Sequence, residues 1–158
     1  MGLTLREEIK QHKAFGSLEE EAALNLLRTA QLLQDAVELL LRPHGVTPAQ
    51  YNVLRILRGA GEAGLGRNDI RDRMITRMPD VTRLLDRMEE ANLVRRERSE
   101  SDRRCVPTTL TERGRALLGE IEGPLAEAQF RQFGHLSRGQ LHSLVEALTQ
   151  VRQHLSEP

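Results

Sequence analysis

The sequence predicts a mainly α-helical protein with one small β-hairpin, and three observations support this fold class. Three hydroxyl residues are each followed three positions later by Glu or Gln, a pattern that marks the start of a helix. Apolar residues recur at helical spacing through most of the chain. One polar turn, SESD, separates two short segments that can both be extended, as the strands of a hairpin are.

The first long helix is predicted over residues 18–42. It starts after Ser17, which fits a capping box with Glu20, and it stops before Pro43. Its apolar residues form two stripes, Leu26, Ala30, Leu33, Val37 and Leu40 in one and Leu24, Leu27, Leu32, Leu39 and Leu41 in the other. A helix that is apolar over so much of its surface buries two faces. One small domain rarely offers two, so we expect a partner subunit to cover the second.

Two shorter helices follow. One is predicted over residues 48–58, because Thr47 and Gln50 fit a capping box and Pro48 suits the first helical position. It ends in the glycine-rich loop GAGEAGLG. Another short helix is then predicted over residues 67–74.

A fourth helix, residues 78–91, leads into the hairpin. Its apolar residues stand at i, i+3, i+4 and i+7: Val81, Leu84, Leu85 and Met88. Pro79 fits only the first turn of this helix, and Asn92 suits the left-handed conformation found after a helix. The predicted strands of the hairpin are residues 93–98 and 104–110.

Two further helices complete the chain. Thr111 begins a helix that is predicted to reach about Phe133. Ser137 and Gln140 form the third capping box and open the last helix. One apolar stripe runs along that helix: Leu141, Leu144, Val145, Leu148, Val151 and Leu155. Pro107 lacks a backbone donor and therefore predicts an edge position in its strand.

Composition narrows the class of protein. The 158 residues are one domain's worth of chain, with 23 basic and 23 acidic residues and a formal net charge of zero. The sequence has no apolar run of about 18 residues and no signal peptide, so we expect a cytoplasmic protein without a membrane partner. A single cysteine, Cys105, excludes an intramolecular disulfide framework and a cysteine zinc cluster.

Arginines nevertheless gather around one loop, in NLVRRERSESDRRCVPTTLTERG. The order helix, short helix, helix, hairpin is that of a helix-turn-helix with a wing. The 78–91 helix would then be a recognition helix, whose Thr and Arg side chains read base edges in the major groove. Two other interpretations stay open: a solvated charged helix face, and arginine usage set by a GC-rich genome. A groove feels charges within about 8 Å at physiological salt, so a neutral total does not exclude DNA binding.

The run VTRLLDRMEEANLVRRERSESDRRCVPTTLTERGRALL resembles the core signature of the MarR family of bacterial winged-helix regulators. The similarity covers about residues 47–118 by motif. It implies that Arg104 enters the minor groove, that Asp102 orients it, and that Arg103 pairs with phosphate. The full set of predicted DNA-binding residues is Arg67, Arg77, Asp80, Thr82, Arg83, Arg87, Arg98, Asp102, Arg103 and Arg104. The sequence departs from the family at Asn92, where glycine is usual, at Gly66, where a hydroxyl cap is more common, and over the stretch 78–80.

The resemblance also implies a homodimer and a division of the chain into three parts. Residues 1–46 and 112–158 would form a helical dimerisation region, and residues 47–111 would form the winged helix-turn-helix lobe. A monomer is the alternative, which the apolar first helix disfavours. A two-fold dimer places two recognition helices roughly 34 Å apart and predicts double-stranded DNA with a pseudo-palindromic operator as the partner.

The function implied is that of a transcriptional repressor released by a small aromatic or lipophilic effector. The effector would lie between the dimerisation helices and the DNA-binding lobe, lined by Leu41, His44, Val46 and Tyr51. No enzyme signature, cofactor motif or metal-ligand spacing is found, so we expect neither catalysis nor a cofactor or metal. Two alternatives remain: a winged-helix module for protein–protein contact, and a redox-responsive regulator acting through Cys105.

Overall fold

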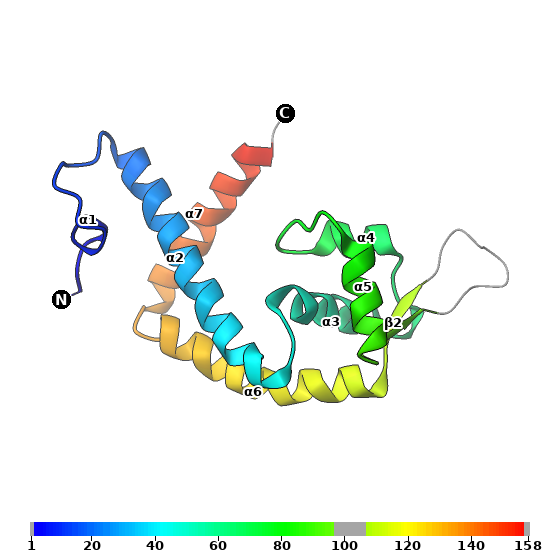
Figure 1. The fold of residues 1–158 in the computed structure, drawn as a ribbon. Coiled ribbons are helices and arrows are strands. Elements are labelled where there is room, and N and C mark those ends of the chain that lie inside the picture. Colours follow the sequence, from blue (N-terminus) through cyan, green and yellow to red (C-terminus); the bar gives the residue numbers. More distant parts are fainter. Residues whose placement is uncertain (1, 97–106, 157–158) are drawn as a thin grey trace.

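A computed structural model of the chain describes residues 2–96 and 107–156 and has a mainly helical fold with one two-stranded hairpin, as predicted (Figure 1). The α-helices are α1 (Leu5–Glu8), α2 (Leu18–Leu41), α3 (Pro48–Ala60), α4 (Arg67–Arg73), α5 (Val81–Glu90), α6 (Glu112–Phe133) and α7 (Arg138–Ser156). The 3-10 helices are η1 (Arg42–His44) and η2 (Gly61–Ala63), and the strands are β1 (Val94–Arg96) and β2 (Thr108–Leu110).

One apolar core holds the helix-turn-helix lobe together. It joins α3, α4 and α5 to the hairpin, to the end of α2 and to the first half of α6. Its fully buried side chains include Leu41, Val53, Leu54, Leu57, Ile70, Leu85, Met88, Val94, Leu118 and Ile121. Each contributes about 1.5 to 3 kcal/mol of transfer free energy when it leaves water. The lobe is thereby fixed on α6.

Helices begin where the capping residues predict, with one correction. The boxes at Thr47 and at Ser137 form, each with reciprocal side-chain and backbone hydrogen bonds. Ser17 also caps α2, since its Oγ accepts from the Glu20 N–H at 3.1 Å. The predicted return bond to Ser17 is wrong, because the Glu20 carboxylate accepts from the N–H of Gly16 at 2.6 Å instead.

The two ends of α5 differ in how well they were predicted. The helix begins at Val81 rather than at 78, because Asp80 caps it: its Oδ1 accepts from the Arg83 N–H at 2.9 Å. At the other end Asn92 has φ 56°, as predicted. The Leu93 N–H donates to the Met88 carbonyl at 2.9 Å, which completes a Schellman motif. This left-handed residue turns the chain directly into the hairpin.

The hairpin is antiparallel, with Val94 opposite Leu110 and Arg96 opposite Thr108. Thr108 also forms a bridge with Leu65, which attaches the hairpin to the loop before α4. The rest of the predicted strands, residues 97–98 and 104–106, lies outside the described residues. The hairpin base is therefore held on both sides by the helical lobe.

The start of α6 is joined closely to the end of α5. The Thr111 hydroxyl donates to the Asn92 carbonyl at 2.7 Å and accepts from the Gly114 N–H at 3.0 Å. The Thr111 N–H donates to the Leu93 carbonyl at 3.2 Å. Gly114 packs so closely here that a Cβ on it would lie 2.2 Å from the Leu93 oxygen. The spacing of Thr111 and Gly114 thus encodes a close backbone contact.

The terminal helices α2 and α7 extend away from the lobe (Figure 1). Both carry apolar residues that the single chain leaves exposed: Leu18, Leu26, Leu27, Leu32, Leu39, Leu144, Val145, Val151 and Leu155. In the part of the chain that the structure describes, no helix combines the length and the apolar character needed to cross a membrane. The division at residues 46 and 111 stays a prediction.

Candidate nucleic-acid interface

The exposed surface of α5 carries three of the predicted DNA-binding side chains. Thr82, Arg83 and Arg87 are all exposed, while the opposite side of the helix is buried in the core. Arg83 and Arg87 are one helical turn apart and therefore lie on the same face. Such a surface offers guanidinium and hydroxyl groups, which suit phosphate oxygens and purine edges.

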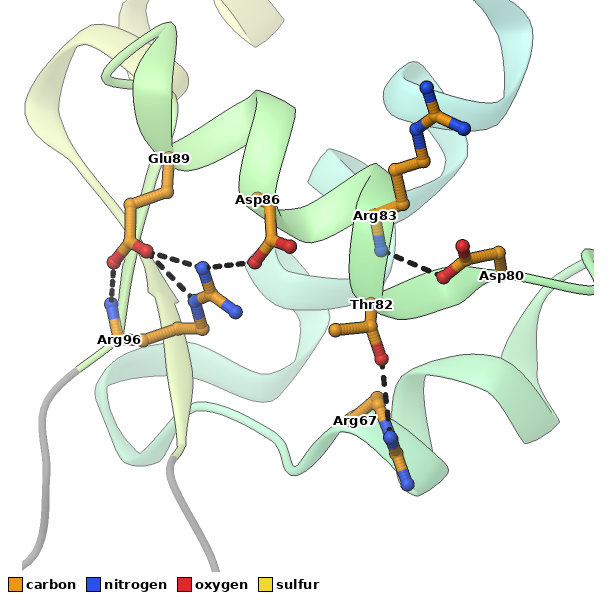
Figure 2. A network of polar contacts seen from close by, with 7 residues as sticks. All are labelled: Arg67, Asp80, Thr82, Arg83, Asp86, Glu89 and Arg96. Carbon is orange, nitrogen blue, oxygen red and sulfur yellow. Dashed lines mark hydrogen bonds and ion pairs between the residues drawn. The ribbon is translucent and has the colours of Figure 1, made fainter.

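Arg67, at the start of α4, lies against this surface. Its Nη1 donates to the Thr82 hydroxyl at 3.2 Å (Figure 2). The Thr82 hydroxyl is the acceptor in this bond, so it keeps its own hydrogen for a further bond. Gly66 is the N-cap residue of α4 and provides no side-chain cap. Two predicted residues from different helices are thus brought together.

The remaining predicted residues of this region lie in or beside the turn before α5. Arg77 is exposed there. The turn is held by Asn52 of α3, whose Oδ1 accepts from the Ile75 N–H at 2.9 Å. Asp80 is exposed and has the capping role described above, so its carboxylate fixes the N-terminus of α5. Its contact with DNA stays a prediction.

A network of four hydrogen bonds joins the end of β1 to α5. The Arg96 N–H donates to Glu89 Oε1 at 2.9 Å, and its Nε and Nη2 donate to Glu89 Oε2 at 2.9 and 2.5 Å. Nη2 also donates to Asp86 Oδ1 at 2.6 Å (Figure 2). The Arg96 side chain is 26% exposed, less than either acid. We call these three residues the Arg96 clamp.

The clamp shifts the pKa of two of its members. Hydrogen bonds from Arg96 hold the pKa of Glu89 below its ordinary value, and those to Glu89 raise the pKa of Arg96. Both groups are therefore charged at neutral pH. Arg96 belongs to the arginine-rich stretch around the hairpin but not to the predicted DNA-binding set, and the structure shows it bound to two carboxylates of the same chain.

We expect the clamp to make folding stability depend on acid pH. Because Glu89 has a lowered pKa in the folded chain, its contribution is full above the unfolded pKa and is lost as pH falls through the folded value. The pair is partly exposed, so the contribution is at most about 1 kcal/mol. Urea unfolding between pH 7 and pH 3 should show a shallower loss of stability for Glu89→Gln than for the unchanged protein. Parallel curves would contradict this expectation.

The predicted wing-tip residues Arg98, Asp102, Arg103 and Arg104, and also Cys105, lie outside the described residues. Arg95 is described: its Nε donates to the Thr109 hydroxyl across the hairpin at 3.4 Å. The roles of the wing tip and of the cysteine stay predictions.

The predicted effector-lining residues come from the end of α2, from η1, from the loop after it and from α3. Leu41, Val46 and Tyr51 belong to the buried core, with at most 7% of each exposed. His44 is partly exposed, and its Nδ1 lies 3.8 Å from Glu120 Oε2 of α6. The structure thus groups them where α2, α3 and α6 meet, but three of the four pack as core residues.

Comparisons with known proteins place this geometry in a family. The model of the MarR family matches residues 46–106. The HTH-type transcriptional repressor MdtR of Bacillus subtilis (strain 168) is 29% identical over 79% of this chain and 86% of its own length. A MarR transcription factor from Planctomyces limnophilus is 36% identical over 87% of this chain and 99% of that one, with a TM-score of 0.67.

The structure of the transcriptional repressor CouR, solved on a 23-mer DNA duplex, is also similar. It has 27% identity and a TM-score of 0.77, and the match covers 90% of this chain and 99% of CouR. CouR from Rhodococcus jostii RHA1 has also been solved with p-coumaroyl-CoA, and that structure matches at 25% identity with a TM-score of 0.73 over 87% of this chain and 95% of that one. Together with the exposed α5 surface beside a hairpin, these matches along most of the chain show that the protein belongs to the MarR family of transcription regulators.

Proposed function

We propose that this chain is a homodimeric, sequence-specific DNA-binding repressor that a small effector releases from its operator. The observation that carries the DNA-binding part is the exposed row of Thr82, Arg83 and Arg87 on α5, with the hairpin beside it. The DNA-bound structure of the similar repressor CouR supports the same assignment.

Selection of bound sequences from a random pool of DNA duplexes tests this proposal. The expected result is an inverted repeat whose half-sites are about one helical turn apart, because a two-fold dimer presents two recognition helices at that spacing. Enrichment of a single half-site would contradict the dimeric mode of binding. Failure to retain any duplex at low ionic strength would overturn the proposal and favour a protein–protein interaction module.

Dimerisation is supported by the apolar faces of the terminal helices. In α7, Val145 is 60% exposed and Leu155 is 78% exposed. Apolar patches of this extent are rare on monomers and mark interaction surfaces. A second copy of the chain is the partner that a pseudo-palindromic site requires. The two-fold dimer would bury α2 and α7 of both chains.

We expect Val145→Glu to convert the dimer to a monomer, because it places a charge in the apolar stripe of α7. The matched control is Ser143→Glu, which adds the same charge to an exposed position on the opposite side of α7. Sedimentation velocity measures the result, and circular dichroism checks that both variants keep their helices. Equal masses for the two variants would exclude this face from the interface.

The effector is proposed to be a small aromatic or lipophilic acid bound near Leu41, His44, Val46 and Tyr51. The similar CouR structure with p-coumaroyl-CoA supports an aromatic acyl group as the class of ligand. A ligand that binds better to one spacing of the two lobes shifts the population away from the form that fits DNA. A thermal-shift screen with salicylate-like and cinnamate-like acids, followed by DNA release, tests this. Stabilisation without DNA release would contradict the regulatory role.

A further inference from the structure

The Arg96 clamp links the end of β1 to α5 through four hydrogen bonds. Arg96 is the last residue of β1, and its backbone N–H and its side chain both bind Glu89. Asp86 and Glu89 are three residues apart in α5, so their carboxylates lie on one side of the helix and can share one guanidinium. With about 3.6 residues per turn, Glu89 lies away from Arg83 and Arg87, and Asp86 lies between Glu89 and Arg83 around the helix. The hairpin is therefore tied to α5 beside the surface that carries those two arginines.

We propose that Arg96 is a positioning residue for DNA binding, which holds the hairpin at a fixed place beside α5 through Glu89 and Asp86. The proposal rests on the DNA-binding function proposed above. Neither acid belongs to the predicted DNA-binding set, and a carboxylate near a phosphate backbone repels it. The two acids nevertheless favour binding, because a hairpin that is already in place loses less freedom when DNA binds.

The sign of the effect of Glu89→Gln separates this role from simple electrostatics. Electrostatics alone predicts tighter DNA binding, since the change removes a negative charge beside the helix. The clamp predicts weaker binding, by about tenfold, because Gln keeps the shape of Glu but cannot hold the guanidinium with an ionised carboxylate. The two explanations thus differ in direction and not merely in size.

The matched control is Glu90→Gln. Glu90 is the next residue of α5 and is exposed, and its side chain makes no hydrogen bond or ion pair within residues 2–96 and 107–156. It undergoes the same change of charge without touching the clamp. We expect DNA affinity to stay the same or to rise slightly for Glu90→Gln and to fall for Glu89→Gln. If both variants bind DNA as tightly as the unchanged protein, or more tightly, the positioning role is wrong.

A second variant, Arg96→Gln, distinguishes positioning from a direct phosphate contact. A lost phosphate contact lowers the slope of log affinity against log salt by about 0.9. The clamp predicts that Arg96→Gln weakens DNA binding and leaves this salt slope unchanged. It also predicts that the double variant with Glu89→Gln loses no further affinity, because both changes break the same interaction. A reduced slope, or additive losses, would assign Arg96 to the phosphate backbone instead.

Amide hydrogen exchange provides a measurement that needs no DNA. In the unchanged protein the Arg96 N–H is bonded to Glu89 and should exchange slowly. In Glu89→Ala this bond is absent, so the same amide should exchange fast. Fast exchange in the unchanged protein would overturn the clamp itself. If the unchanged protein binds no duplex but this amide is protected, the proposed function fails while the clamp stands. Thermal unfolding of each variant shows that weaker binding does not come from an unfolded lobe.

Discussion

Gly114→Ala is expected to lower the free energy of unfolding by about 3 kcal/mol. The added Cβ would lie 2.2 Å from the carbonyl oxygen of Leu93, closer than any real contact allows, and that oxygen belongs to the backbone. Relief therefore requires α6 to move away from the end of α5, which also strains the bond between Thr111 and Asn92. Urea unfolding at one fixed protein concentration measures the change.

Gly119→Ala is the matched control for that loss. Gly119 lies in the same helix, and a Cβ there would meet nothing within 4 Å. Alanine is the better helix former, so this variant should gain up to about 1 kcal/mol. Two changes of identical chemistry, five residues apart, should thus have opposite signs. Similar small effects at both positions would show that the α5–α6 junction can relax.

Arg83→Ala is expected to weaken binding to the selected operator by about 100-fold. A well-placed arginine contributes about 1 to 3 kcal/mol, every 1.4 kcal/mol is a factor of ten, and a dimer loses two such side chains. Arg83 is exposed, and the Asp80 carboxylate that caps α5 accepts from its backbone N–H and not from its guanidinium. The helix should therefore survive the change. Fluorescence anisotropy against the operator and against a random duplex measures the loss and its specificity.

Arg131→Ala is the control for the loss of one positive charge. Arg131 is 70% exposed near the far end of α6 and lies 3.8 Å from Glu127. We expect operator affinity to change less than twofold, with the oligomeric state checked for both variants. A loss for Arg83→Ala that is equal on operator and random DNA would mean that Arg83 binds phosphate and does not read bases. An unchanged affinity would remove α5 from the interface.

Local rules were enough to predict most of the helical framework. A hydroxyl followed by Glu or Gln marks a helix start through bonds within four residues, so Thr47 and Ser137 could be identified from their neighbours alone. Asn92 was predictable for the same reason, because few residues adopt φ 56° without strain. The resemblance to the MarR family added the expected homodimer and the roles of Asp102, Arg103 and Arg104, which stay predictions.

Contacts between distant residues could not be predicted from those rules. The sequence shows five arginines around the hairpin turn but not that Arg96 contacts two acids seven and ten residues earlier. It shows Arg67 and Thr82 as separate candidates, although the two side chains are bonded. The start of α5 was also predicted wrongly. Pro79 favoured a start at residue 78, but the Asp80 carboxylate caps the helix, which therefore begins at Val81. In each case the local sequence allows more than one partner or helix start, and the packing of the folded chain decides which one forms.

The continuity of α6 has a mechanical consequence. A helix of 22 residues is about 33 Å long, and Thr111 at the N-terminus of this one is bonded to Asn92 just after α5. A tilt of about 5° at the Phe133 end therefore carries the hairpin base through about 3 Å, comparable to one hydrogen-bond length. The same helix that supports the lobe thus amplifies small rotations. In the proposed dimer, the two α5 surfaces would have to match successive turns of a duplex and would tolerate little such displacement.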